Sequence, residues 1–306
     1  MNDIDGRHTS VATVFGLTIL LACLAACDSP TMIDLPSENQ GSRIDYVVLH
    51  FTSEDYAESV RLLTTRTENP VSAHYLIPLA GDPTYPRRSA IIHRLVPEER
   101  RAWHAGRSYW AGEESLNSRS IGIEIVNLSR CETPADETVY TPVEDNCRFK
   151  AFTDDQIELV IGLLTDILAR YPGIDAVDVI GHADIAPARR YDPGPLFPWQ
   201  RLYEAGIGAW PDETSVARWR NEFSAVMPTT LYVQEALAAY GYKLSLTGEE
   251  DLETRNALRA FQLHFLPSRV SGLVDQETAA VLFALLEKYR PDELEVLAQS
   301  VNAYPL

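Results

Sequence analysis

Two histidines at the ends of apolar strands and one aspartate in a stiff loop constrain this sequence more than any other feature. His50 lies near the end of the apolar run 46–51, His182 follows a second apolar run, and Asp192 precedes the turn-forming residues 193–195. A lone histidine at a strand end is more often a packed core residue. Two of them with an aspartate, however, form the ligand set of an open zinc site, which leaves one position for water. The pattern therefore predicts metal-assisted hydrolysis.

The overall composition limits the class of partner. The chain has 306 residues and a formal net charge of -18, with 45% hydrophobic and 23% charged residues. Its length allows two domains, and its composition is typical of globular proteins. Because no basic stripe is present to hold phosphates, the sequence argues against nucleic-acid binding. A negatively charged substrate would have to be held by local contacts.

The N-terminal segment predicts export. Residues 11–26 are almost wholly apolar, and polar residues follow at once. This run is short for a membrane span and is typical of a signal-peptide core. It ends in Leu24-Ala25-Ala26-Cys27, which resembles the bacterial lipoprotein box. We therefore expect a signal peptide over 1–26, lipid on Cys27 that anchors the chain to a membrane, and a periplasm-facing place in the bacterial cell envelope. An ordinary cleaved signal is the alternative.

The remaining cysteines agree with an oxidising compartment. Once Cys23 is removed and Cys27 carries lipid, Cys131 and Cys147 are left as an even pair. They bracket a polar stretch that is typical of an exposed loop. We predict a disulfide bond between them, worth about 3 kcal/mol on the loop-entropy model. Two free thiols are the alternative.

Strands and helices alternate between residues 43 and 206, which predicts a mixed sheet with helices on both faces. One long helix, 153–171, begins with a capping box at 153–156. Strands are predicted from apolar runs at 46–51, 74–78, 90–96, 121–126 and 176–182.

The chain divides into segments of different composition. A polar tether over 27–42 precedes the α/β domain at 43–206, and a segment rich in Gly, Pro and Trp at 207–228 is predicted to link two domains. Residues 229–290 are periodic and predict a small bundle of three helices at 230–240, 252–265 and 275–289. The last segment, 291–306, is an acidic tail without a strong signal.

Glu124 is the most informative residue after the histidines. Strand alternation places Ile121, Ile123 and Ile125 on one face and Gly122 with Glu124 on the other. A carboxylate in an apolar strand is costly unless it is paired or lies in a wet cleft, and the glycine leaves room for a close approach. Glu124 is either a general base beside the metal or a surface residue on an edge strand.

Several motifs together resemble a known family. They occur in the order found in type 2 N-acetylmuramoyl-L-alanine amidases, and they cover residues 43–203. The motifs are His50-Phe51-Thr52, Ser72-Ala73-His74-Tyr75-Leu76, Ala102-Trp103-His104-Ala105-Gly106, Ser120-Ile121-Gly122-Ile123-Glu124, His182-Ala183-Asp184-Ile185-Ala186-Pro187 and Asp192-Pro193-Gly194-Pro195.

The resemblance implies a fold, a cofactor and site residues. The fold would be the mixed-sheet domain shared with phage T7 lysozyme and peptidoglycan-recognition proteins. One Zn²⁺ would be held by His50, His182 and Asp192, and Glu124 would act as the catalytic acid and base. Related amidases often carry a lysine where this chain has Arg190, so a proton-donating role does not transfer, whereas stabilisation of an oxyanion by a fixed positive charge does.

The same motifs suggest substrate contacts. His74 and His104 match the family pattern outside its ligand positions, so they are expected to support the ligands or to contact substrate, and Trp103 is a candidate wall of a sugar or peptide groove. Burial of the aromatic ring is the alternative for Trp103.

The C-terminal segment resembles peptidoglycan-binding domains. The similarity lies in 233–237, 241–242 and 254–262, whereas the family's Asp-Gly-x-Phe-Gly stretch is replaced by Thr247-Gly248-Glu249-Glu250-Asp251. The domain either binds peptidoglycan or serves only for packing.

These observations lead to one hypothesis and two alternatives. The hypothesis is a monomeric zinc amidase that acts on peptidoglycan and muropeptide fragments. The first alternative is a peptidoglycan-recognition protein without catalysis. The second is a glycosidase that pairs Glu124 with Asp184 or Asp192, which would leave His50 and His182 without a role.

Overall fold

The structure, a computed structural model, describes residues 33–35, 37–132 and 138–303. It divides into two units, 1–40 and 41–306, and the folded elements belong to the second. The predicted signal peptide at 1–26 and the predicted lipidation site Cys27 lie outside the described residues. Within the described part of the chain, no helix has the length and apolar character needed to cross a membrane.

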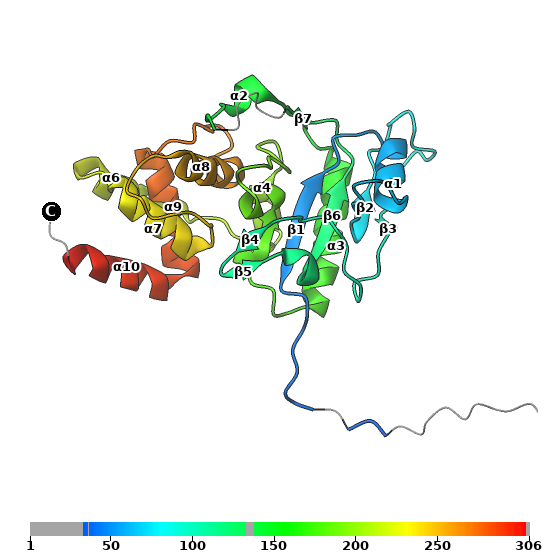
Figure 1. Cartoon of the computed structure of the whole chain (residues 1–306), viewed down its shortest axis with the longest axis horizontal. Coiled ribbons are helices and arrows are strands. Elements are labelled where there is room, and N and C mark those ends of the chain that lie inside the picture. The colour runs from blue at the N-terminus through cyan, green and yellow to red at the C-terminus, as the bar shows by residue number, and fades with distance from the viewer. Residues whose placement is uncertain (1–32, 36, 133–137, 304–306) are drawn as a thin grey trace, which may run out of the picture. The chain divides into compact units, whose positions relative to one another are not determined.

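A five-stranded mixed sheet forms the centre of residues 41–306 (Figure 1), as predicted. The order is β3-β2-β6-β1-β9, in which β3 pairs antiparallel with β2 and the other neighbours pair in parallel. The long apolar strands β1 and β6 lie inside the sheet, where both faces are covered. The strands are β1 (Tyr46–Phe51), β2 (Tyr75–Ile77), β3 (His93–Arg94), β6 (Ser120–Ile125) and β9 (Val179–Gly181).

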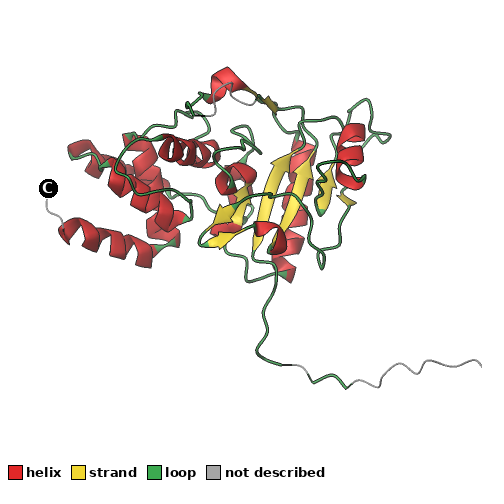
Figure 2. Ribbon diagram, viewed as in Figure 1, coloured by secondary structure: helices red, strands yellow, loops and turns green. Residues whose placement is uncertain are grey.

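Helix α3 (Asp154–Arg170) covers one face of this sheet (Figure 2). Its predicted capping box is present, because Thr153 Oγ1 accepts from Gln156 N at 3.3 Å and Gln156 Oε1 accepts from Thr153 N at 3.2 Å. Alternate residues of β1 and β6 point to α3, and they form an apolar core with it. The core includes Val47, Leu49, Ile121, Ile123, Ile125, Ile157, Val160, Leu164 and Ile167.

The opposite face carries the polar residues of β1 and β6 and is covered by short elements and by the C-terminal helices. The short α4 follows β9 directly, so the chain turns at Gly181 from strand to helix. The remaining elements of this region are α1 (Tyr56–Thr64), β4 (Tyr109–Trp110), β5 (Glu113–Glu114), β7 (Arg130–Cys131), α2 (Val143–Asn146), β8 (Cys147–Arg148), α4 (His182–Ile185) and α5 (Trp199–Glu204).

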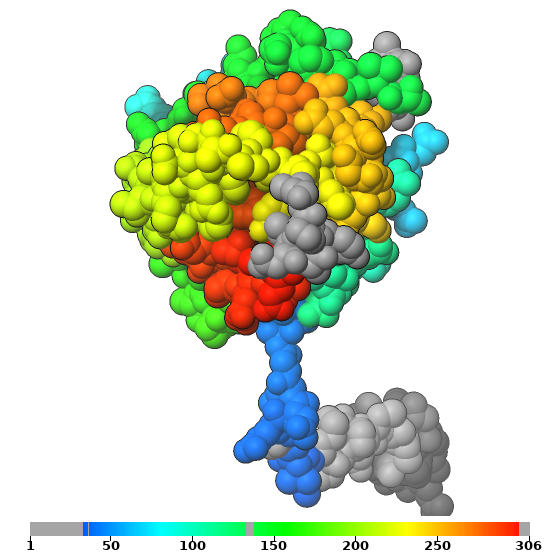
Figure 3. Space-filling view, turned by 90° about the vertical axis from the view of Figure 1, so that its left-hand side faces the viewer, coloured from blue at the N-terminus to red at the C-terminus, as the bar shows by residue number. Residues whose placement is uncertain are grey.

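The C-terminal region is helical, as predicted, but it contains more than the three expected helices. Two further helices come from the expected linker and the expected tail, and both pack on the others (Figure 3). Phe223 in the linker lies 5.0 Å from Phe283 between ring centroids, and Leu297 in the tail is buried. The helices are α6 (Glu213–Ala225), α7 (Thr230–Tyr240), α8 (Leu252–Phe265), α9 (Gln276–Tyr289) and α10 (Pro291–Ala303).

Two buried glutamines organise the loops before α8 and α9 in the same way. Gln234 donates to Thr254 Oγ1 at 2.7 Å, and Gln262 donates to Thr278 Oγ1 at 2.9 Å. Each glutamine also accepts a backbone N–H from the loop that precedes the helix. The stretch 247–251, which departs from the family pattern, therefore forms a loop that hydrogen bonds to Gln234 hold in place.

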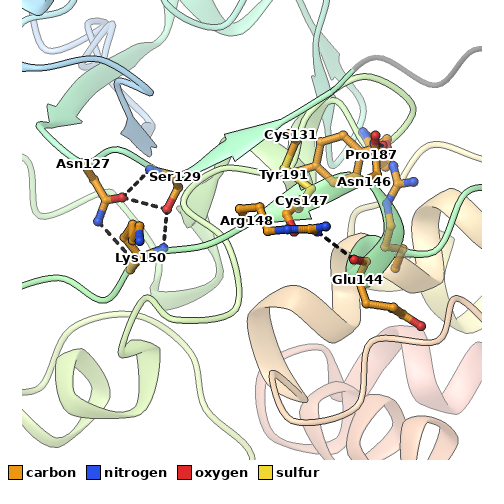
Figure 4. Close-up of a disulfide and its surroundings, with 11 residues drawn as sticks. Asn127, Ser129, Cys131, Glu144, Asn146, Cys147, Arg148, Lys150, Pro187 and Tyr191 are labelled. Atoms are coloured by element: carbon orange, nitrogen blue, oxygen red, sulfur yellow. Dashed lines mark hydrogen bonds between the residues drawn. A yellow bond between two sulfur atoms is a disulfide. The ribbon is translucent and has the colours of Figure 1, made fainter.

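The structure joins Cys131 to Cys147 by a disulfide bond across the antiparallel pair β7 and β8 (Figure 4). The segment before β7 is held by Asn127, whose Oδ1 accepts from Ser129 N at 2.8 Å, and by Lys150 N, which donates to Ser129 Oγ at 2.8 Å. The bond thus closes the base of a loop next to residues that line the cleft described below.

The double variant Cys131→Ser, Cys147→Ser should lower the free energy of unfolding by about 3 kcal/mol, because the unfolded chain gains the freedom of the released loop. Urea unfolding measures this difference. Reductant should bring the wild-type protein to the value of the variant and leave the variant unchanged. Equal stability of the oxidised wild-type protein and the variant would contradict the prediction.

Candidate metal centre

Strand pairing brings the candidate residues together. His50 on β1 is in register with Glu124 on β6, and Leu49 is in register with Gly181, the residue before His182. Because these strands are parallel and adjacent, side chains from residues 50, 124 and 182 meet at the C-terminal ends of the strands. The site is therefore assembled by three strands that are far apart in the sequence.

The loop that carries Asp192 folds back onto α4. Ala183 N donates to Asp192 O at 2.8 Å. A Cβ atom on Gly181 would lie 2.7 Å from Pro193 Cδ, so only glycine permits this approach. The close contact of the two segments brings Asp192 beside His182.

The three predicted ligands converge on one point. His50 Nδ1 lies 2.9 Å from His182 Nδ1 and 3.0 Å from Asp192 Oδ2, and His182 Nδ1 lies 3.1 Å from the same oxygen. All three side chains are buried. Tetrahedral Zn²⁺ with bonds of about 2.0–2.1 Å holds its ligand atoms roughly 3.3 Å apart, so this triangle has nearly the required size. The buried His-His-Asp site is compatible with zinc.

The charges of the triangle also suit a cation. Burial lowers the pKa of His182 to about 4, so its imidazole is neutral at pH 7. Burial opposes ionisation of Asp192, but the contacts with His182 and His50 hold the pKa of this carboxyl well below its ordinary value. An ionised carboxylate oxygen and the lone pair of a neutral imidazole therefore face the same point.

Hydrogen bonds assign the tautomer of His50. Ser120 Oγ donates to Leu116 O at 2.7 Å, so its oxygen accepts from His104 Nε2 at 3.2 Å. His104 Nδ1 is then an acceptor, and His50 Nε2 donates to it at 3.0 Å. Burial holds the pKa of His104 well below its ordinary value, which keeps this ring neutral. The chain of bonds leaves the lone pair of His50 on Nδ1, toward the triangle.

His182 is oriented by a carbonyl group. Its Nε2 lies 3.2 Å from Ala105 O, which only accepts, so Nε2 carries the proton and Nδ1 has the free lone pair. A longer approach of 3.5 Å, from Arg189 Nη2 to the same nitrogen, is a weaker contact. Both histidines thus present Nδ1 to the metal position.

Glu124 lies beside the triangle on an interior strand, so the alternative of an edge strand is wrong. Burial raises its pKa to about 7, and its Oε2 atom is shielded from solvent with no hydrogen-bond partner among the described residues. The neighbouring Gly122 has a different role from the expected one. A Cβ atom there would lie 2.3 Å from the His104 ring, so the glycine makes room for His104.

Two adjacent arginines lie near the site but differ in their contacts. Arg190 is exposed, and its charge lowers the pKa of both Glu124 and His182. Arg189 is half-buried, and its guanidinium donates to Ala105 O at 2.5 Å and to Arg107 O at 2.6 Å. Arg190 is therefore a positive charge available at the site, and Arg189 connects two loops.

For His74, the structure favours the supporting role over substrate contact. This side chain is fully buried, its Nε2 donates to Arg100 O at 3.1 Å, and its Nδ1 accepts from Gly122 N at 3.0 Å. His104 is also buried and orients His50, which agrees with the first of its two expected roles, support of a ligand, rather than with substrate contact. Trp103 is 47% exposed and remains available for substrate.

A cleft of about 540 Å³ lies beside Asp192, and sequence reasoning missed one of its walls. That wall comes from α8 in the C-terminal region, through Leu252, Asn256 and Arg259. The sequence carries no signal for it, because these residues appear there only as part of a periodic helix. The other lining residues include Phe51, Ser53, Arg107, Cys131, Arg189, Arg190 and Tyr191.

His104→Ala should weaken zinc binding about 10- to 100-fold, because His50 loses the acceptor that fixes its tautomer. Competition with a chromophoric chelator measures the affinity. His93→Ala, which removes a histidine outside the site, is the matched control and should bind zinc as the wild-type protein does. A His104→Ala protein that is folded by circular dichroism and has unchanged affinity would show that the bond to His50 is dispensable.

Comparison with protein families gives two matches. Residues 40–195 match the N-acetylmuramoyl-L-alanine amidase family, and residues 228–282 match a peptidoglycan binding domain. The chain is 43% identical over 253 residues to the N-acetylmuramoyl-L-alanine amidase AmiD of Escherichia coli strain K12, which covers 82% of this chain and 85% of that protein.

Solved structures give the same result. The crystal structure of AmpDH3 from Pseudomonas aeruginosa matches with a TM-score of 0.76 at 43% identity and covers 85% of this chain and 100% of that one. The complex of Escherichia coli AmiD with its substrate matches with a TM-score of 0.69 at 40% identity and covers 83% and 93%. Sequence, fold and the His-His-Asp site agree, and the chain belongs to the N-acetylmuramoyl-L-alanine amidase family.

Proposed function

We propose that this protein is a zinc-dependent amidase that hydrolyses the bond between N-acetylmuramic acid, or its anhydro form, and L-alanine of the peptidoglycan stem peptide. The observation that carries the proposal is the buried triangle of His50, His182 and Asp192 beside Glu124. The relatives support the substrate, since AmpDH3 is solved with anhydromuramic pentapeptide and AmiD with anhydro-N-acetylmuramic acid-L-Ala-D-gamma-Glu-L-Lys.

His50 Nδ1, His182 Nδ1 and Asp192 Oδ2 would hold the Zn²⁺ ion. A bound zinc ion polarises a carbonyl group and lowers the pKa of a water molecule. The role of the protein is to keep both imidazoles in the Nδ1-accepting tautomer, through His104 and through Ala105 O. The ligand set is therefore ready before the metal binds.

Glu124 would be the general base and then the general acid. Burial raises the pKa of this carboxyl, which favours its taking a proton from the attacking water and returning it to the leaving amine. Its shielded Oε2, which has no partner among the described residues, is the atom that we assign to this transfer. Arg190, which stays protonated, would stabilise the oxyanion as a fixed charge.

The location would be the cell envelope, where the substrate lies. The lipoprotein box at 24–27 supports a signal peptide and a lipid anchor on Cys27, which would hold the protein on a membrane facing the periplasm. The match of 228–282 supports binding of peptidoglycan by the C-terminal helices. We also propose that the protein is a monomer.

The glycosidase alternative loses its carboxylate pair. Asp184 is buried and accepts hydrogen bonds from Tyr242 and His264, and Asp192 belongs to the triangle. Neither carboxylate is free to work with Glu124 on a sugar bond. The binding-only alternative differs in its products, so the following experiment separates it from the amidase.

The wild-type protein should release free stem peptide from a defined anhydromuropeptide and leave the sugar intact, as measured by mass spectrometry of the products. Glu124→Gln should keep zinc but lose turnover by roughly a hundredfold or more, because the water loses its base. Glu99→Gln, an exposed glutamate, serves as the control. Cleavage of the sugar bond, no release at all, or normal turnover in Glu124→Gln would each refute part of the proposal.

Arg190→Gln should lower kcat about 100-fold, because the oxyanion loses a positive charge, whereas Arg190→Lys should retain most of it. Steady-state kinetics on the same substrate check this. If both variants lose activity equally, the geometry of the guanidinium matters more than its charge, and the electrostatic role is wrong.

A further inference from the structure

The segment between His182 and Asp192 is held from outside the amidase region. It supplies two of the three triangle residues, and it packs against α8 of the C-terminal region. Residues of the C-terminal region contact this segment near both of its ends, close to His182 and to Asp192.

Asp184, two residues after His182, makes the first contact. Its Oδ1 accepts from Tyr242 Oη at 2.6 Å, and its Oδ2 accepts from His264 Nδ1 at 2.8 Å and from Gly181 N at 2.8 Å. The side chains of Asp184, Tyr242 and His264 are buried. A buried carboxylate requires hydrogen-bond donors, and two of the donors to Asp184 come from the C-terminal region, Tyr242 from the loop after α7 and His264 from α8.

The ring of His264 is itself fixed. It stacks between Trp199 at 3.7 Å and Phe265 at 3.9 Å between ring centroids. The hydroxyl of Tyr242 is likewise placed by the packing of its ring against Trp110 at 5.0 Å. The donors to Asp184 are therefore rigid, and they fix the turn of chain in which Gly181 and His182 lie.

Arg259 of α8 makes the second contact. Its Nη2 donates to Pro187 O, and its guanidinium lies 4.4 Å from the centre of the Tyr191 ring, next to Asp192. Asn146 also donates to Tyr191 Oη at 3.1 Å. Figure 4 shows Tyr191 near Asn146, Pro187 and the disulfide. Tyr191 is thus fixed on its face and at its hydroxyl.

His50 has a different kind of support. It lies on an interior strand of the sheet, and its other nitrogen bonds to His104, which belongs to the amidase region. Among the described residues, the C-terminal helices make no hydrogen bond to His50. Two ligands therefore lie in a segment that residues of the C-terminal region contact, whereas the third lies on a strand of the sheet.

We propose that Tyr242, His264 and Arg259 are positioning residues for the metal site. In addition to any ligand that the C-terminal helices bind, these side chains hold His182 and Asp192 at the separation that a zinc ion needs. The inference rests on the proposed function, because it assigns a role toward the same metal centre. It extends the site across the boundary between the two family matches.

Tyr242→Phe removes one donor to Asp184 and keeps the ring. We expect zinc to bind about tenfold more weakly, as for other groups that orient a metal ligand, when the metal alone is titrated in competition with a chelator. Tyr240→Phe is the matched control, because this tyrosine is also buried in the C-terminal region, whereas the hydrogen bonds that Asp184 accepts come from Gly181, Tyr242 and His264. The control should bind zinc as the wild-type protein does.

A role in stability alone would give another result. It would lower the Tm of the zinc-free Tyr242→Phe protein and leave its zinc affinity unchanged, and this outcome would overturn the proposal. Equal losses of affinity in Tyr240→Phe and Tyr242→Phe would also overturn it. Should Tyr242→Phe not fold, Arg259→Gln tests the second contact, and Arg259→Lys, which keeps the charge but not the planar fork, should restore part of the affinity.

Failure of the proposed function is distinguishable from failure of this inference. A wild-type protein that does not bind zinc would refute the metal centre itself. A wild-type protein that binds zinc but releases no peptide would refute the amidase function and leave the positioning role intact. Unchanged zinc affinity in Tyr242→Phe, or in Arg259→Gln if Tyr242→Phe does not fold, would refute the positioning role alone.

Discussion

The parallel pairing of β1 with β6 and β9 is the constraint on which the rest of the structure depends. It places His50 in register with Glu124 and brings Gly181, and with it His182, alongside. Backbone hydrogen bonds in a sheet fix register within one residue, and a slip of one residue would turn these side chains to the opposite face. Because the opposite face is the apolar core under α3, the register is specified by burial and the chemistry follows from it.

Once the register is fixed, the buried polar groups on this face need hydrogen-bond partners. The bonds that they form with one another build the site. His104, Ser120 and the carbonyl of Ala105 accept or donate so that each imidazole has one possible tautomer. Glu124 is the exception, since its Oε2 has no partner among the described residues and its pKa is raised by burial to about 7. A group that remains unsatisfied within a satisfied network is where a reacting molecule is expected.

The C-terminal region is more closely joined to the site than a separate binding domain would require. Its helix α8 lines the cleft, and side chains from it and from the preceding loop bind the segment 182–192. The buried Gln234 and Gln262 fix the loops between its helices, so these contacts come from a rigid support. Some residues of the motifs that resemble a binding domain thus stabilise the protein's own loops.

The sequence alone determined the elements and the identity of the metal-site candidates. A continuous apolar run predicted β1, an alternating run predicted β6, and the Thr153–Gln156 box predicted the start of α3. The motifs around His50, His182 and Asp192 pointed to one zinc site. These are local signals, and each is readable within about ten residues. The helices α6 and α10 were missed because their apolar residues gain their structural meaning from tertiary packing, α6 against α9 and α10 against α7 and α9.

Only the tertiary structure decided what the other polar residues do. His74 and His104 have the same appearance in the sequence, yet one joins backbone groups and the other orients His50. Likewise, nothing near Asp184 indicates that Tyr242 and His264 will reach it. The physical reason is that a hydrogen bond depends on the distance and direction between two groups, which in this site lie up to 142 residues apart. The sequence specifies that distance and direction only through the complete packing of the chain.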